Sequence, residues 1–233
     1  MSSSRAIALT ALVTLAASSG CASQIGFGRA RTLEPGRQQV SGLMEVDAVT
    51  IPTDDNKPVP LPWFQLGVGY RRGLASGFDL GARAWGFGVP GHLSFGGALD
   101  AKVQLVRSPF ADRGADAATG LTLGYQQVQV GGAPWHVFGA GVPLLMGVNF
   151  GKNQFVVGPR AGGFVWTGYG MDTIVVPFFG GSTGVSVEVA RKTQLMPEIV
   201  VTYVPVSFNG ELDRDRRYGS YQVQLGLTVS YEP

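Results

Sequence analysis

The C-terminal stretch Tyr221–Tyr231, YQVQLGLTVSY, decides the fold. Its odd-numbered positions hold Tyr, Val, Leu, Leu, Val and Tyr, whereas its even-numbered positions hold Gln, Gln, Gly, Thr and Ser. Successive side chains of an extended strand point to opposite faces, so a period of two places every large apolar group on one side. The stretch therefore predicts a β-strand with one wholly apolar face and one small or polar face.

A terminal strand with this alternation and an aromatic residue near its end resembles the assembly signal of bacterial outer-membrane β-barrels. Here Glu232 and Pro233 follow Tyr231, whereas members of that family usually end on Phe or Trp. The resemblance implies a transmembrane barrel that is surrounded by outer-membrane lipid and has the barrel-assembly machinery as a partner.

The same alternation recurs upstream, for example over Phe64–Tyr70 and Leu93–Leu105. The expected strands, of about 10–17 residues, fit the roughly 9–11 residues that cross a bilayer at a tilt, with rims added. We therefore predict an all-β fold, an antiparallel up-and-down transmembrane β-barrel of about 10 strands (8–12), preceded by a cleaved signal peptide. The expected strands are 38–50, 62–72, 77–87, 92–106, 116–129, 134–149, 153–168, 174–190, 194–206 and 218–232.

Composition agrees with a lipid-facing surface. Charged residues make up 15% of the chain, against roughly 25% in soluble domains, and the hydrophobic content of 45% excludes a disordered chain. A net charge of +2 without a basic stripe argues against a nucleic-acid partner.

The first 20 residues have the pattern of a signal peptide. Met1–Arg5 carries one positive charge, Ala6–Ala17 is apolar, and Ser18–Gly20 are small. Twelve apolar residues are too few for a helix that spans a bilayer, which needs about 20. We expect residues 1–20 to be removed.

Cys21 is the only cysteine, so a disulfide within the chain is excluded. Together with Ser19 and Gly20 it resembles the lipobox of bacterial lipoproteins, although Ser18 stands where Leu is usual. The resemblance implies that Cys21 is acylated and that Ala22 permits sorting to the outer membrane. The alternative is ordinary cleavage nearby. With Cys21 acylated, residues 21–36 would form a periplasmic tether and residues 37–233 the barrel.

Charged residues within the expected strands share the phase of the small and polar positions. Because charge facing lipid costs a few kcal/mol near the midplane, we expect them to face the lumen. Mixed signs favour a mutually paired polar core in a narrow lumen, and the alternative is the lining of a weakly selective pore. The expected lumen residues are Glu45, Asp47, Arg71, Asp79, Arg83, Asp100, Lys102, Arg160, Glu188 and Glu198.

An even strand number places both termini at one end, which we expect to be periplasmic. Long polar connections at 51–61 and 209–219 would then be extracellular, where they could bind a surface ligand. All four tryptophans would fall at the extracellular end and form part of an aromatic girdle, with a second aromatic girdle at the periplasmic end. Pro143 and Pro159 interrupt neighbouring strands and predict a shared bulge.

No residue pattern identifies a catalytic, cofactor or metal site. His92 and Ser94 resemble the His-x-Ser arrangement of lipid A deacylases, but the alternation places both on the lumen side, away from lipid. His136 beside Trp135 is expected to be interfacial, and arginines crowd Asp213 and Asp215, as a solvated loop would.

We therefore expect a non-enzymatic outer-membrane barrel lipoprotein with a largely filled polar lumen and a structural or surface-loop binding role. The alternatives are a small-solute channel, a membrane-embedded lipid hydrolase and a soluble periplasmic barrel on a lipid tether. The apolar face of the last strand argues against the soluble barrel.

Acylation gives the first testable prediction. Cells fed labelled palmitate should incorporate the label into the wild-type chain, and Cys21→Ala should lose it because its thiol is the acceptor. The control is Ser19→Ala, which keeps the thiol. Label retained in Cys21→Ala would contradict the lipobox interpretation.

Overall fold

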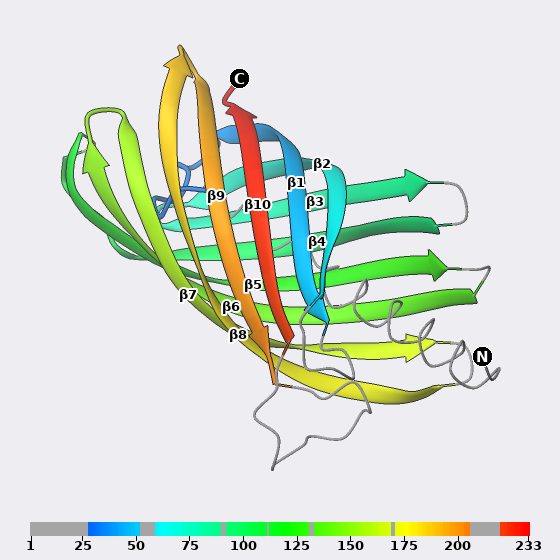
Figure 1. Cartoon of the computed structure of the whole chain (residues 1–233). Coiled ribbons are helices and arrows are strands. Elements are labelled where there is room, and N and C mark those ends of the chain that lie inside the picture. The colour runs from blue at the N-terminus through cyan, green and yellow to red at the C-terminus, as the bar shows by residue number, and fades with distance from the viewer. Residues whose placement is uncertain are drawn as a thin grey trace, which may run out of the picture.

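A computed structural model describes residues 28–51, 59–89, 92–110, 112–130, 133–168, 171–205 and 220–233. The predicted signal peptide, Cys21 and most of both long connections lie outside these residues. The described part contains ten β-strands, which confirms the predicted number and fold class (Figure 1). The strands are β1 Gln38–Ile51, β2 Val59–Ala75, β3 Phe78–Val89, β4 His92–Val106, β5 Arg113–Val130, β6 Ala133–Phe150, β7 Asn153–Gly168, β8 Met171–Ala190, β9 Thr193–Val204 and β10 Ser220–Tyr231.

The sheet is a closed antiparallel barrel in which each strand pairs with its neighbours in sequence. The barrel closes where β1 pairs with β10, from Val40 opposite Tyr231 to Val49 opposite Gln222. We call the end where β1 begins and β10 ends the turn end, because short connections such as Gly151–Lys152 and Arg191–Lys192 lie there. The opposite end is called the loop end. Both ends of the barrel sequence therefore meet at the turn end.

The period of two in the sequence corresponds to the inner and outer faces of the barrel. Along β10, Tyr221, Val223 and Leu225 are exposed on the outer face, whereas Gln222 and Gln224 are buried in the lumen. The outer face is apolar around the barrel, and Leu99 on β4 is 65% exposed. A surface of this kind suits lipid and not water. Among the described residues no helix has the length and apolar character needed to cross a bilayer.

The two strand prolines behave differently from the prediction. Pro143 pairs with Arg160, and the same register resumes at Met146 opposite Val157, so no bulge forms between β6 and β7. Pro143 is buried and Pro159 is exposed, which places the two rings on opposite faces. Because a proline lacks only its own N–H donor, a local gap in the ladder accommodates each ring without a shift of register.

Lipid exposure of the outer face can be tested at Leu99. In lipid vesicles, Leu99→Arg should lower the free energy of unfolding by about 2–4 kcal/mol, because its side chain would face hydrocarbon near mid-height. The measurement is equilibrium unfolding in urea, with Leu99→Phe as the apolar control. Equal stability of the two variants would contradict a membrane-embedded outer face.

Candidate functional site

The lumen gathers the charged side chains that were expected to face inward. Nine of the ten are buried on the inner face of the barrel. The exception is Glu188, which lies at the turn end and pairs with exposed Lys152 at 2.8 Å. Glu188 is thus part of the rim and stands outside the buried cluster. The nine buried members are Glu45, Asp47, Arg71, Asp79, Arg83, Asp100, Lys102, Arg160 and Glu198.

Asp100 is the centre of an ion-pair network on β2–β5. Arg83 donates to both of its carboxylate oxygens, from Nε at 2.8 Å and from Nη2 at 3.1 Å. The hydroxyl of Thr122 donates at 2.7 Å, and the Arg71 guanidinium lies 3.6 Å away. Two parallel hydrogen bonds from one guanidinium are the strongest geometry available to a carboxylate. Asp100 therefore holds together side chains from four neighbouring strands.

Asp79 extends this network toward the turn end. It accepts a hydrogen bond from Arg71 at 2.5 Å, and the Lys102 ammonium group lies 3.6 Å away. Its second oxygen also accepts the backbone N–H of Leu33 at 3.1 Å. Asp79 thus joins the lumen network to the chain that precedes β1.

A second polar cluster lies beside the first, on β1, β2 and β10. Glu45 and Asp47 are fully buried two residues apart on β1. Gln65 donates to Asp47 at 3.0 Å, and Gln224 donates to Glu45. Arg160 on β7 and Glu198 on β9 also approach each other inside the lumen, with Nη2 and Oε1 3.7 Å apart. The acids of this second cluster therefore interact with the amide groups of Gln65 and Gln224 and with the guanidinium of Arg160.

Residues 29–36, which we call the strap, cross the turn end of the lumen (Figure 1). At one side the backbone N–H of Gly36 donates to the carbonyl of Gly73 on β2, at 2.9 Å. At the other side the N–H of Ala30 donates to Gln154 on β7, at 2.7 Å. In the closed strand order β2 and β7 are separated by five steps in either direction, so the contacts of the strap extend over half of the barrel wall.

The described part of the predicted tether, residues 21–36, is held against the inside of the barrel from Arg29 to Gly36. Ala30 and Thr32 are buried, and the latter donates from its N–H to Gln104 at 2.7 Å. The Lys102 ammonium group donates to the carbonyl of Arg29 at 3.0 Å. Inward polar side chains therefore satisfy backbone groups of the strap, which no periodicity in a segment this short could have indicated.

Arg31 and Asp116 form the ion pair that fixes the middle of the strap. The Arg31 Nε lies 3.1 Å from Asp116, which also accepts from Asn149 at 2.8 Å and from Gln154 at 3.0 Å. Asp116 is a lumen residue that was not predicted, although it shares the inward phase of β5. Burial and the nearby charge of Arg31 lower the pKa of the Arg29 guanidinium below its ordinary value.

The strap also balances charge inside the barrel. Among the described strand residues, six buried acids face four buried bases once Asp116 is counted. Arg29 and Arg31 supply two further positive charges from the strap. Charges in a medium of low dielectric constant are tolerated when each has a partner, and the strap supplies one to Asp116 through Arg31.

The loop end of the lumen is apolar, which the sequence analysis did not predict. Trp85, Trp135 and Trp166 point into the lumen and are buried, so they do not form the expected girdle at the lipid interface. The side chain of Trp63 lies outside the described residues. Trp85 donates from Nε1 to Gln126 at 3.1 Å, and Trp166 packs in a cluster from four strands. That cluster contains Val137, Phe164, Trp166, Val176, Phe178 and Val204.

A glycine makes room for this layer. A Cβ on Gly162 would lie 2.2 Å from the carbonyl oxygen of Ala140 and 2.5 Å from the ring of Phe178. Neither distance leaves space for a side chain. The absence of a side chain at Gly162 therefore lets Phe178 fill the lumen, where it stacks on Phe164 with centroids 4.6 Å apart.

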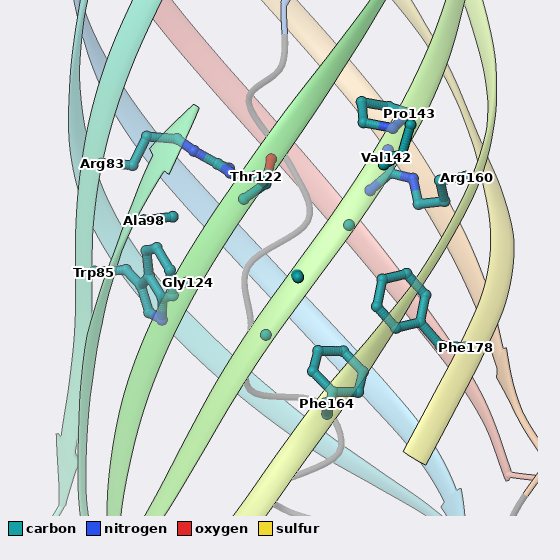
Figure 2. Close-up of a pocket in the computed structure, with 13 residues that line it drawn as sticks. Arg83, Trp85, Ala98, Thr122, Gly124, Val142, Pro143, Arg160, Phe164 and Phe178 are labelled. Carbon is teal, nitrogen blue, oxygen red and sulfur yellow. The ribbon is translucent and has the colours of Figure 1, made fainter. Parts of the chain in front are cut away.

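The polar and apolar layers leave a small cavity between them (Figure 2). Arg83, Thr122 and Arg160 line it on the polar side, and Phe164 and Phe178 line it on the apolar side. Its volume is about 30 Å³. Because one water molecule needs at least ~10–15 Å³ measured in this way, the cavity has room for very few waters.

The His-x-Ser pair does not form a reactive site among the described atoms. Ser94 is fully buried and its hydroxyl accepts a hydrogen bond from the Gln126 amide. The His92 side chain lies outside the described residues. His136 is on the outer face, where its Nδ1 lies 2.8 Å from the Tyr125 hydroxyl. Within the described ranges, no three His, Cys, Asp or Glu side chains gather as they would around a metal ion.

Comparison with known proteins identifies a fold and no more. No protein-family model matches the chain, and no curated protein matches its sequence. The outer membrane protease OmpT from Escherichia coli has a similar structure, with a TM-score of 0.51 and 9% identity over 88% of this chain and 100% of that one. The translocator domain of the autotransporter NalP from Neisseria meningitidis scores 0.39, with 14% identity over 87% of this chain and 90% of that one. The likeness to OmpT, together with the closed ten-stranded sheet, shows the fold of an outer-membrane β-barrel.

The central network can be tested by removing its anion. Asp100→Asn should lower the free energy of unfolding by about 3–5 kcal/mol, because Arg71 and Arg83 stay buried while losing a charged partner. Glu188→Gln is the matched control at the rim, where loss of the pair with exposed Lys152 should cost less than about 1 kcal/mol. Equal losses of unfolding free energy in the two variants would contradict a larger stabilising role for the buried network than for the rim pair.

Proposed function

We propose that this chain is a closed, non-conducting and non-enzymatic β-barrel lipoprotein of the bacterial outer membrane, with both termini in the periplasm. The apolar outer face supports the membrane location. An even strand number with short turns beside the termini supports the orientation, since bacterial single-chain barrels have this arrangement. The lipobox resemblance at Cys21 supports a lipid anchor in the same leaflet that the turn end would face.

The filling of the lumen is the observation that carries the proposal. The strap crosses the turn end, paired charges occupy the middle, and the aromatic cluster fills the described part of the loop end. The cavity of about 30 Å³ between these layers is too small for a hydrated solute. Open aqueous channels belong to barrels of about 16–18 strands, which are considerably wider. A closed barrel acts as a rigid support, and its long polar connections are the natural place for binding at the cell surface.

A small-solute channel is the second candidate, and one observation favours it. Barrel side chains hold the strap within the lumen, whereas the hydrogen bonds between the strap backbone and the barrel backbone lie at the Gly73 end. Such a segment could leave the lumen as a unit if the pair between Arg31 and Asp116 and the side-chain bonds to Ala30, Thr32 and Leu33 were all broken. The aromatic layer would still have to rearrange before solute could pass.

The lipid hydrolase is less well supported. It needs a hydroxyl exposed to lipid, whereas Ser94 is buried and bonded to an amide. Esterase activity that is lost in Ser94→Ala would be required to revive it.

Planar bilayers test the closed state directly. The wild-type chain should show a heat-dependent mobility shift on gels, as a folded membrane barrel does, yet no steady single-channel conductance. The double variant Arg31→Ala with Asp116→Ala should also show no conductance, because the aromatic cluster still fills the loop end when the strap is loosened. Openings in this variant alone would favour the channel. Lys152→Ala, which removes an exposed ion pair at the same end, is the control and should stay silent. Steady conductance in the wild type would overturn the closed barrel in favour of the channel.

A further inference from the structure

An apolar groove runs along the outer face of the barrel near the turn end. Its volume is about 310 Å³, at the lower end of the range for small-molecule pockets. The strands that form it are β4 to β7, well away from the strap's entry beside β2. The residues used in the argument below are Val106, Ala115, Ala117, Met146, Val148 and Phe155.

The groove exists because two small residues lie among larger ones. Ala115 pairs with Val148, and Ala117 pairs with Met146, so each alanine lies directly beside a longer side chain. Val148 in turn pairs with Phe155 on the next strand. Since all these residues face outward, the alanines form a floor and their neighbours form the walls.

A cation lies at the turn end of this groove. Arg113 is two residues before Ala115 on the same strand, so the two share the outward face. Its guanidinium lies 4.2 Å from the centre of the exposed Phe110 ring. Among the described residues Arg113 forms no ion pair, whereas Arg107 and Lys152 nearby pair with Glu34 and Glu188.

The position of the groove decides the kind of occupant. Aromatic and arginine side chains together mark the boundary between hydrocarbon and head groups, and a long arginine can reach from one into the other. Below that boundary an apolar groove must be filled by hydrocarbon, because water is excluded there. At the boundary itself the unpaired guanidinium favours a phosphate, which it can bind through two parallel hydrogen bonds.

We propose that this groove is a binding site for an anionic glycerophospholipid of the leaflet at the turn end. One acyl chain lies over Ala115 and Ala117, and the phosphate of the head group lies against Arg113. The inference rests on the proposed function in one respect, because the turn end must lie at a membrane interface.

The test uses the refolded full-length barrel in detergent micelles, with bound lipid counted by native mass spectrometry. Phosphatidylglycerol should bind about fivefold more tightly than phosphatidylethanolamine with the same acyl chains, which converts to about 1 kcal/mol for one basic residue near an anionic surface. Arg113→Gln should remove this preference. Ala117→Phe should weaken the binding of both lipids by filling the groove.

Arg72→Gln is the matched control, because Arg72 faces outward at the same end on β2, beside the large side chains of Tyr70 and Leu74. It should keep the preference. Equal binding of both lipids by the wild type, an unchanged preference in Arg113→Gln, or an unchanged affinity in Ala117→Phe would each overturn the site. Competition by inorganic phosphate alone would overturn the role of the acyl chain.

The heat-shift gel and reconstitution into vesicles separate this result from the proposed function. A barrel that inserts and shifts on heating but shows no lipid preference disproves the site only. A chain that neither inserts nor shifts disproves the membrane location.

Discussion

The ladder between β1 and β10 is the constraint on which the rest of the molecule depends. A backbone N–H or C=O has no water to bond inside a bilayer, so a sheet can span it only when its two edges pair with each other. The register from Val40 opposite Tyr231 onward closes the sheet. Once the sheet is closed, every strand residue must face either outward or into a narrow lumen. The alternation along each strand then separates the side chains that face lipid from those that line the lumen.

A narrow lumen then imposes its own chemistry. Polar side chains that point inward are removed from bulk water, so each must find a partner within reach. Asp100 finds two arginines and a hydroxyl, and Asp116 finds two amides and the strap. Near the loop end, aromatic side chains fill the lumen instead. The closed interior is thus a packed core built largely of polar groups, with an aromatic layer on one side.

The outline of the fold could be predicted from sequence because period-two alternation is a local signal. The expected limits of β4 and β7 coincide with those observed. Of the ten charged residues that the alternation assigned to the lumen, nine are buried there. Partners could not be predicted, because the pairing of Arg83 with Asp100 depends on the register between strands. The strap was missed since Ala30 and Thr32 carry no periodic pattern. The direction of Trp85, Trp135 and Trp166 was misjudged because the girdle interpretation ignored their phase.

The strap has a consequence for how the barrel assembles. Its partners include Asp79, Gln104, Asp116 and Gln154, which lie on four strands that follow it in the chain. A sheet that ends before β7 cannot hold the strap across its full width, although the strap is the earlier part of the sequence. Seating of the strap therefore waits for most of the wall to form, and a partly built barrel exposes this segment.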